Sequence, residues 1–235
     1  MKKKIILLKL TGTIFIDQKT KLFTRNFIDS IVDQIKQLFD RYQFSIVIGG
    51  GNLFRGAQDN GDLQLRPAVA HTIGMIGTTM NGLVLYDLLQ QKNVPSTLLC
   101  AFDCPLAGEP ISQEKIDNAH AENKVIIFSG GTGNPYISTD TNAAIRARQI
   151  GALELWKATN VDGIYNVDPN KDPNAIIIAE QTYQDALKNN THIMDQAALI
   201  IAQEGKITTR VFNAFNKNAL LNASNNVNFG SKMIH

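Results

Sequence analysis

The stretch that decides the fold is FSIVIGGGNLFRG, residues 44–56. Its first five residues form an apolar run typical of a buried strand, and the run leads directly into three glycines. Glycines after a strand expose main-chain N–H groups at a bend, and α/β proteins bind phosphate with such groups. Arg55 follows closely and adds a planar, permanently charged donor for the same anion. The stretch predicts a phosphate-binding bend, with a tight structural turn as the alternative.

The two commonest phosphate-binding motifs do not match this stretch. Gly51 and Gly56 have the spacing of the glycines in a Walker P-loop, but Ala57 and Gln58 stand where Lys and Ser or Thr are required. The G-x-G-x-x-G pattern of dinucleotide-binding folds does not match either. We therefore expect a protein that handles phosphorylated small molecules through a different loop.

Composition narrows the class of protein. A chain of 235 residues with 44% hydrophobic residues can bury a large core. A formal net charge of +2 gives no field that indicates nucleic acid as a partner. No apolar run reaches the roughly 18 residues that cross a bilayer, so we expect a cytoplasmic protein with no membrane partner. Cys100 and Cys104 form a lone pair without the second half of a metal site, which predicts reduced structural thiols.

Apolar, strand-like segments alternate with segments of helical periodicity along the whole chain. Strands are expected at residues 5–10, 44–48, 96–100, 124–128, 153–156 and 208–212. Helices are expected at residues 26–42, 68–91, 113–122, 142–150, 182–189, 194–203 and 219–223. Residues 58–67 are polar and predict a surface loop or lid. The pattern predicts an α/β fold, a three-layer αβα sandwich around a mostly parallel twisted sheet, in a single domain of residues 1–235.

Ligands of such sheets bind beyond the carboxyl ends of the strands, so polar residues there are candidates for function. Lys9 lies inside an apolar strand, just before a turn at Thr11 and Gly12. Burying a lysine is costly without an anion, which favours a phosphate partner. The alternative is a lysine at the end of the strand that reaches solvent.

A second glycine-rich segment, SGGTGNPYISTD at residues 129–140, follows another predicted strand. Ser138, Thr139 or Asp140 can cap the helix that comes next, and free N–H groups at a helix start suit a phosphate. Asp140 would repel a phosphate unless it held a lysine or a magnesium ion, and helix capping alone is the alternative. Residues 157–173 contain Asp-Gly and Asp-Pro turn signals and are weak evidence by themselves.

Taken in order, these segments resemble the amino acid kinase family, and within it the bacterial uridylate (UMP) kinases. The resemblance is collinear over nearly the whole chain. It rests on GGGNLFRG at 49–56, MNGL at 80–83, GTGNP at 131–135, residues 159–165 with Asp168-Pro169, and Met194-Asp195. The resemblance implies the amino acid kinase fold, transfer of the γ-phosphoryl group of ATP to UMP, and a homohexamer. It also implies a UMP site in the N-terminal part, an ATP site in the C-terminal part, and Mg²⁺ carried by ATP rather than by protein ligands.

The resemblance also implies roles for individual residues. Lys9 would contact the transferred phosphoryl group, while Asp140 and Asp195 would orient the lysine and the metal-bound nucleotide. The residues implied to bind ATP are Lys9, Leu10, Thr11, Gly12, Gly51, Arg55, Thr159, Tyr165 and Asp168. The residues implied to bind UMP are Gly50, His71, Thr132, Gly133, Asn134, Pro135, Tyr136, Ile137, Ser138 and Thr139.

Two positions depart from the family pattern. Thr13 stands where the family usually has a glutamate, and His71 where it has an aspartate that hydrogen-bonds the UMP ribose. A neutral histidine can still accept one hydrogen bond, with a different charge and reach. Two other functions stay open: a sibling kinase of the same fold that acts on a carboxylate or carbamate, and, because of these two departures, a nucleotide sensor with little catalysis.

Overall fold

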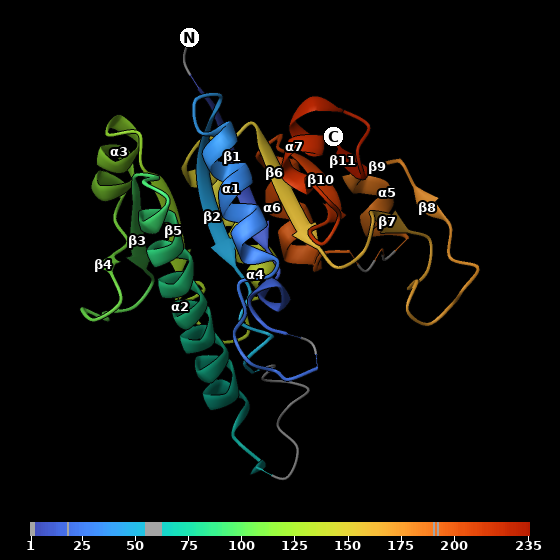
Figure 1. The fold of residues 1–235 in the computed structure, drawn as a ribbon. Helices are drawn as coiled ribbons and strands as arrows, with labels where there is room; N and C mark the ends of the chain where they lie inside the picture. Colours follow the sequence, from blue (N-terminus) through green and yellow to red (C-terminus); the bar gives the residue numbers. More distant parts are fainter. Residues whose placement is uncertain (1–2, 18, 55–62, 190, 192) are drawn as a thin grey trace.

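A nine-stranded sheet forms the centre of the computed structural model, which describes residues 3–17, 19–54, 63–189, 191 and 193–235. The strands lie in the order β4-β3-β5-β2-β1-β6-β10-β11-β9, from left to right in Figure 1. They are β1 (Lys4–Leu10), β2 (Tyr42–Ile48), β3 (Ser96–Cys100), β4 (Glu109–Pro110), β5 (Val125–Ser129), β6 (Glu154–Thr159), β9 (Glu180–Thr182), β10 (Thr208–Asn213) and β11 (Ser231–Ile234). Only the β10–β11 pair in this sheet is antiparallel, so the prediction of a mostly parallel sheet is confirmed.

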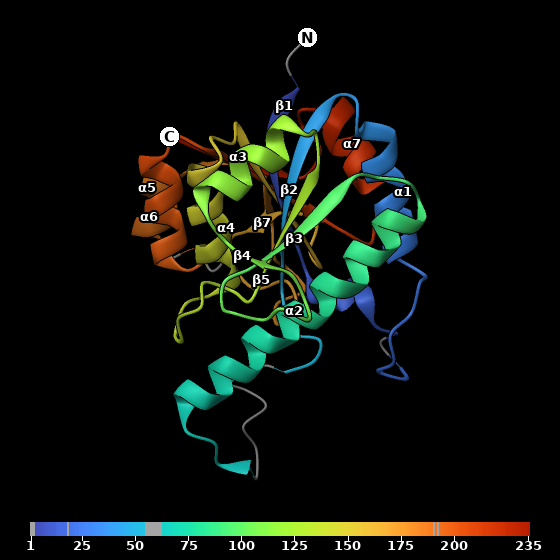
Figure 2. The ribbon, with the colours of Figure 1, turned by 90° about the vertical axis from the view of Figure 1, so that its left-hand side faces the viewer.

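Helices cover both faces of the sheet (Figure 2). One face carries α1 (Ile28–Leu38), α2 (Pro67–Gln91) and α7 (Ala219–Asn225). The other carries α3 (Gln113–Ala121), α4 (Thr139–Gln149), α5 (Tyr183–Lys188) and α6 (Gln196–Glu204). Alternate residues of a strand point to opposite faces, so Leu8 of β1 packs in one hydrophobic core and Leu7 in the other. The three-layer αβα sandwich is therefore confirmed.

The register of the central strands gathers the candidate loops at one edge of the sheet. Leu10, the last residue of β1, pairs with Ile48 of β2 and with Ala158 of β6. Parallel strands end at the same edge, so the turn after β1, the glycines after β2 and the segment after β6 lie next to one another. A 3₁₀ helix, η1 (Gly12–Phe15), follows β1 directly.

Several elements differ from their predicted extent. The prediction ended β6 at residue 156 because Lys157 interrupts the apolar run. In the structure Lys157 is buried within the strand, which continues to Thr159. α4 begins at Thr139 rather than at residue 142. β11 and the short antiparallel pair of β7 (Ile164–Tyr165) and β8 (Ile177–Ile178) were not predicted. Residues 58–62 of the predicted loop at residues 58–67 lie outside the described residues, and α2 begins at the last residue of the loop.

One described helix, α2, is long and apolar enough to cross a membrane by length and composition alone. Polar residues such as His71, Thr72 and Asn81 interrupt the segment, so it is not the continuous apolar run that the sequence was searched for; it meets the criterion by its mean hydropathy. The finding is weak evidence for a membrane, since the core helix of a soluble protein passes the same test. α2 packs against β3 and β5 of the sheet.

Candidate active site

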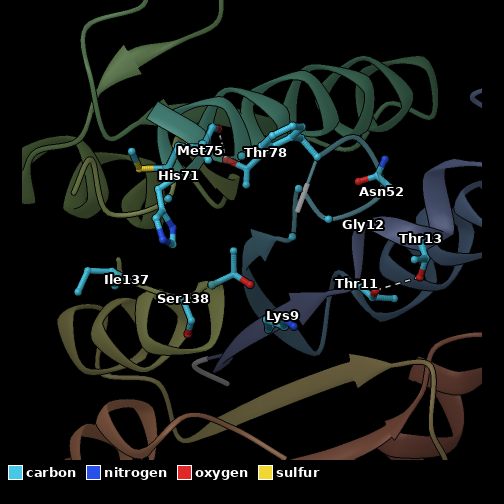
Figure 3. A pocket seen from close by; sticks show the side chains of 18 residues that line it. Lys9, Thr11, Gly12, Thr13, Asn52, His71, Met75, Thr78, Ile137 and Ser138 are labelled. Atoms are coloured by element: carbon cyan, nitrogen blue, oxygen red, sulfur yellow. Dashed lines mark hydrogen bonds between the residues drawn. The ribbon is translucent and has the colours of Figure 1, made fainter. Parts of the chain in front are cut away.

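Two cavities lie beyond the carboxyl ends of the central strands. The first has a volume of about 350 Å³ and is lined by the turn after β1, the glycines after β2, the N-terminal half of α2 and the start of α4 (Figure 3). The second has a volume of about 640 Å³ and is lined by the segment after β6, the β7 region and the residues that precede α6. Both positions agree with the rule that ligands of parallel sheets bind at this edge.

A cluster of three charged residues, the charged junction of Lys9, Asp140 and Lys157, separates the two cavities. Lys9 lines the first cavity and Lys157 the second. The Nζ atom of Lys9 lies 3.1 Å from Oδ1 of Asp140, and Nζ of Lys157 lies 2.6 Å from Oδ2. Lys157 also donates a hydrogen bond to the main-chain carbonyl of Ile193. Lys9 is buried with an anion as its partner, so the alternative of a lysine that reaches solvent is wrong.

The burial of the charged junction shifts the pKa values of two of its members. Burial alone would raise the pKa of Asp140, but the positive charges of Lys157 and Lys9 outweigh it and hold the pKa well below its usual range. Burial lowers the pKa of Lys157 to about 8, against the attraction of Asp140 and with added repulsion from Lys9. Asp140 is therefore ionised at neutral pH. Lys157 is protonated at neutral pH, but its pKa of about 8 lies only slightly above it.

Ser138 caps α4, which leaves the side chain of Asp140 free for the two lysines. The Ser138 hydroxyl accepts hydrogen bonds from the main-chain N–H groups of Asp140 at 3.1 Å and Thr141 at 3.0 Å. Helix capping as the sole role of Asp140 is therefore wrong, and the expectation that it holds a lysine is confirmed.

Asp195 ties two helices together rather than contacting a lysine of the charged junction. It caps α6 by accepting from the N–H of Ala198 at 3.1 Å, and the same oxygen accepts from the Thr141 hydroxyl at 2.6 Å. Its other oxygen accepts from Ser138. Among the described residues no ion pair links Asp195 to Lys9 or Lys157. The resemblance implied that Asp140 and Asp195 orient Lys9. Of these two carboxylates, Asp140 contacts Lys9 directly and Asp195 does not.

The glycines around the first cavity are needed because other groups approach them closely. A Cβ atom on Gly12 would lie 2.2 Å from Oδ1 of Asn52 and 2.5 Å from the Gly49 carbonyl oxygen. A Cβ atom on Gly50 would lie 2.5 Å from the Gly74 carbonyl oxygen on α2. Gly49, Gly50 and Gly51 all line the cavity, at the place where the sequence predicts a phosphate-binding bend. Residues 49–54 are called the glycine loop below; Arg55 lies outside the described residues.

His71 projects from α2 into the first cavity, opposite Ile137 and Ser138 (Figure 3). Its ring lies 4.9 Å from the ring of Tyr136, with an angle of 56° between the ring planes. Tyr136 has a φ angle of +67°, in the left-handed region that side chains with a Cβ rarely adopt. Backbone strain of this kind is concentrated at functional sites.

The structure brings most of the predicted ATP and UMP residues to the two cavities. The first cavity collects Lys9, Thr11, Gly12, Gly50, Gly51, His71, Ile137, Ser138 and Thr139. The second collects Thr159, Tyr165 and Asp168. Leu10 has its side chain in the hydrophobic core, and only its carbonyl, which accepts from the N–H of Gly49 at 3.0 Å, faces the loops.

The predicted UMP segment divides at Ile137. Thr132, Gly133, Asn134, Pro135 and Tyr136 are not among the residues that line either cavity. Thr132 and Asn134 hydrogen-bond each other, with the Asn134 N–H donating to the Thr132 hydroxyl at 3.2 Å. This part of the segment forms a turn beside the first cavity, with Tyr136 as its contact to His71.

Sequence reasoning missed several residues of the site, above all Lys157. The reasoning that singled out Lys9, a lysine within an apolar strand, applies equally to Lys157, since the strand continues on both sides of it. Asn52, Met75 and Thr78 also line the first cavity. Asn52 belongs to the glycine-rich stretch but was given no role there, and Met75 and Thr78 are uncharged and lie outside every predicted motif.

The described carboxylates do not assemble a metal site. No group of three or more His, Cys, Asp or Glu side chains comes together in the described residues. Both oxygens of Asp140 face lysines, and both oxygens of Asp195 accept hydrogen bonds from hydroxyl groups. Mg²⁺ commonly binds through substrate phosphates and water with few protein ligands.

Known proteins place the chain in a family. The sequence profile of the amino acid kinase family matches residues 4–213. The uridylate kinase of Mycoplasma genitalium is 41% identical over 94% of this chain and 91% of its own length. The uridylate kinase of Mycoplasma pneumoniae is 39% identical over 93% of each chain.

The crystal structure of UMP kinase from Ureaplasma parvum, 33% identical, superposes with a TM-score of 0.94 over the full length of both chains. The UMP kinase of Bacillus anthracis, 28% identical, gives 0.92 over 100% of this chain and 97% of its own. The chain therefore belongs to the amino acid kinase family, and within it to the uridylate kinases.

Proposed function

We propose that the chain transfers the γ-phosphoryl group of ATP to UMP and produces ADP and UDP. The observation that carries the proposal is the charged junction between the two cavities. Lys9 and Lys157 present positive charge to the first and second cavity respectively, and Asp140 holds both. A site that joins two polyanionic nucleotides needs cations at the point where their phosphates meet.

Each cavity suits one substrate in this proposal. The adenosine part of ATP occupies the second cavity, against Thr159, Tyr165 and Asp168. UMP occupies the first cavity, between the glycine loop and His71 on one side and Ile137–Thr139 on the other. The triphosphate extends past the charged junction into the first cavity, along the wall formed by Thr11, Gly12 and Gly51. Arg55 remains a predicted phosphate contact.

The chemistry follows from the charges. The nucleophile is a phosphate oxygen of UMP, which is ionised at neutral pH, so the reaction needs no general base. The bond from the γ-phosphorus to the oxygen of the ADP leaving group breaks as the bond to the UMP oxygen forms. Lys9 and Lys157, beside the glycine loop, stabilise the charge on the moving phosphoryl group. Mg²⁺, bound to ATP, adds further positive charge.

The setting of the enzyme is part of the proposal. We place the reaction in pyrimidine nucleotide biosynthesis in the cytoplasm, with residues 1–235 acting as one domain and the chain assembling as a homohexamer. The continuous nine-stranded sheet supports a single domain. The small net charge of +2 supports a partner list without nucleic acid.

The decisive test is a substrate screen that follows ATP-dependent release of ADP with UMP, CMP, dUMP, glutamate and carbamate. We expect UMP to be the best acceptor. Turnover of glutamate or carbamate without turnover of UMP would identify a sibling kinase, and binding of UMP without turnover would identify a nucleotide sensor. The variant Lys9→Ala tests the role of that lysine: turnover within a few-fold of wild type would make its assignment wrong.

A further inference from the structure

We infer that Asn81, a buried residue of α2 that touches neither cavity, is a positioning residue that fixes the glycine loop for phosphoryl transfer. The inference rests on the proposed function, because that function places phosphates against the loop. MNGL at residues 80–83 contributed to the resemblance, but nothing in the sequence assigned it a task. The structure assigns one to its asparagine.

The side chain of Asn81 is fully buried and makes three hydrogen bonds, all to the glycine loop. Its Nδ2 donates to the Gly49 carbonyl oxygen at 2.8 Å and to Oδ1 of Asn52 at 2.7 Å. Its Oδ1 accepts from Nδ2 of Asn52 at 3.1 Å. The two amides therefore form a reciprocal pair, and both donor hydrogens of Asn81 have partners. Gly49 and Asn52 line the first cavity, whereas Asn81 lies one layer behind them.

The amide pair also sets the position of the turn after β1. Oδ1 of Asn52 and the Gly49 carbonyl oxygen, the two groups that Asn81 holds, are the same two atoms that crowd Gly12. In Figure 3, Asn52 lies beside Gly12 at the edge of the cavity. One buried amide on α2 therefore fixes the glycine loop against the turn that follows Lys9. The proposed function places the phosphates of both substrates between these two segments.

An apolar residue at position 81 would leave polar groups without partners. The Gly49 carbonyl would lose one buried hydrogen bond, and the Asn52 amide would lose two that are partly buried. The loop would then relax away from α2. Phosphoryl transfer depends on the alignment of donor and acceptor, and a misplacement of about 1 Å can cost about 100-fold in rate. The effect of Asn81 on the reaction therefore acts entirely through the loop.

The first test compares Asn81→Leu with Thr79→Val. Leucine has the branched shape of asparagine and the same number of non-hydrogen atoms, but it is larger and has no amide. Thr79 is a matched control because it is also buried on α2, and its hydroxyl faces Cys100 at 3.9 Å rather than the loop. We expect Asn81→Leu to lower kcat about 10- to 100-fold, with a smaller change in KM for ATP because adenosine binds in the second cavity. Thr79→Val should keep the wild-type kcat. Wild-type kcat in Asn81→Leu would overturn the inference.

The second test measures loop order without activity. The N–H groups of Leu53 and Phe54 donate to the Gly50 carbonyl at 3.0 and 3.2 Å, so hydrogen exchange at these amides reports on the loop. We expect faster exchange in ligand-free Asn81→Leu and unchanged exchange in Thr79→Val. Unchanged exchange in Asn81→Leu would overturn the inference whatever the kinetics. If the wild type does not phosphorylate UMP, the proposed function is wrong, and the exchange result still decides whether Asn81 positions the loop.

The third test is a double-mutant cycle with Asn52→Ala. If the two amides act as one unit, the double variant should lose no more activity than the worse single variant. Losses in kcat that add up across the two substitutions would show that the residues act independently. That outcome would overturn the positioning role.

Discussion

Lys9 and Lys157 occupy paired register positions on the adjacent parallel strands β1 and β6, and both reach the carboxylate of Asp140. Register partners in a parallel pair point to the same face of the sheet, so two buried lysines lie side by side. Their mutual repulsion is tolerated because one carboxylate offers a separate oxygen to each. The same arrangement delivers one cation to each cavity.

The first prediction concerns the anion of the charged junction. Asp140→Asn leaves two buried lysines without a counter-charge, and removing one partner of a buried ion pair typically costs about 3–5 kcal/mol. We expect a loss of this size in the free energy of unfolding, measured by urea titration. The control is Asp29→Asn, which breaks an exposed pair with Arg25 and should cost less than about 1 kcal/mol. Equal losses in both variants would show that the lysines of the junction gain enough solvent to need no anion.

The second prediction concerns pH and Lys157. Its pKa falls from 10.5 to about 8 on folding, first because of burial. Between these two values the unfolded chain binds a proton that the folded chain lacks, so this group alone makes stability rise with pH over that window. Activity should move the other way, because neutral Lys157 no longer stabilises the phosphoryl group. We expect kcat/KM for ATP, which reports the free enzyme, to fall above about pH 8.

Lys157→Arg is the control for this profile. Arginine stays protonated throughout the range, so the fall near pH 8 should disappear even if the overall rate is lower. The same fall in both proteins would assign it to a different group.

The third prediction concerns the contact between the glycine loop and α2. Gly50→Ala places a Cβ atom 2.5 Å from the Gly74 carbonyl and 3.0 Å from the Thr78 nitrogen, both main-chain atoms of α2. Such overpacking costs about 1–3 kcal/mol, and the displaced loop should also raise KM for UMP.

Gly77→Ala is the matched control, because its Cβ atom would meet its nearest neighbours at an ordinary 3.5 Å. The better helix propensity of alanine should stabilise this variant by up to about 1 kcal/mol. Thermal unfolding and UMP kinetics of the two variants check the prediction; destabilisation by Gly77→Ala alone would contradict it.

The fourth prediction concerns His71. His71→Asp restores the acid that the family usually has, and a carboxylate accepts ribose hydroxyl groups more strongly than a neutral imidazole does. We expect KM for UMP to fall by about tenfold, the size of one charge-assisted hydrogen bond, and dUMP to be rejected more strongly. Tyr136→Leu removes the ring contact to His71 but keeps the histidine, and so separates loss of packing from gain of the acid. An unchanged KM for UMP in His71→Asp would mean that His71 does not lie at the ribose.

The strands and helices with strong hydrophobic periodicity were predictable from the sequence, and the parallel sheet followed from them. The predicted β6 was too short because a lysine such as Lys157 usually ends a buried strand. In the structure the ion pair with Asp140 makes Lys157 compatible with burial. The sequence of the strand shows a lysine that needs an anion, but the anion comes from a helix elsewhere in the chain, so the strand itself does not show which residue supplies it. β11 was missed because its four residues pair with β10 only in the folded sheet.

The sequence predicts the residues of the candidate site that belong to motifs. It does not predict those whose role depends on contacts with residues distant in the sequence. The glycines, Lys9 and Asp140 were found from residue type and position after a strand. The sequence marks Asn81 only as part of the MNGL motif. Its role depends on hydrogen bonds with Asn52, which is 29 positions away in the sequence. The division of the UMP segment at Ile137 depends on the turn at Tyr136, whose positive φ angle is not typical of an aromatic residue.

The two cavities are built from consecutive parts of the chain. The first cavity is lined by residues between Lys9 and Thr139, and the second by residues between Lys157 and Ile193, with Asp140 between them. In the proposed function, the acceptor and the adenosine part of the donor therefore depend on different parts of the chain, whereas the phosphates of ATP contact both. A chimaera that joins residues 1–139 of one relative to the remainder of another should inherit its acceptor preference from the first parent and its preference for the base of the donor from the second.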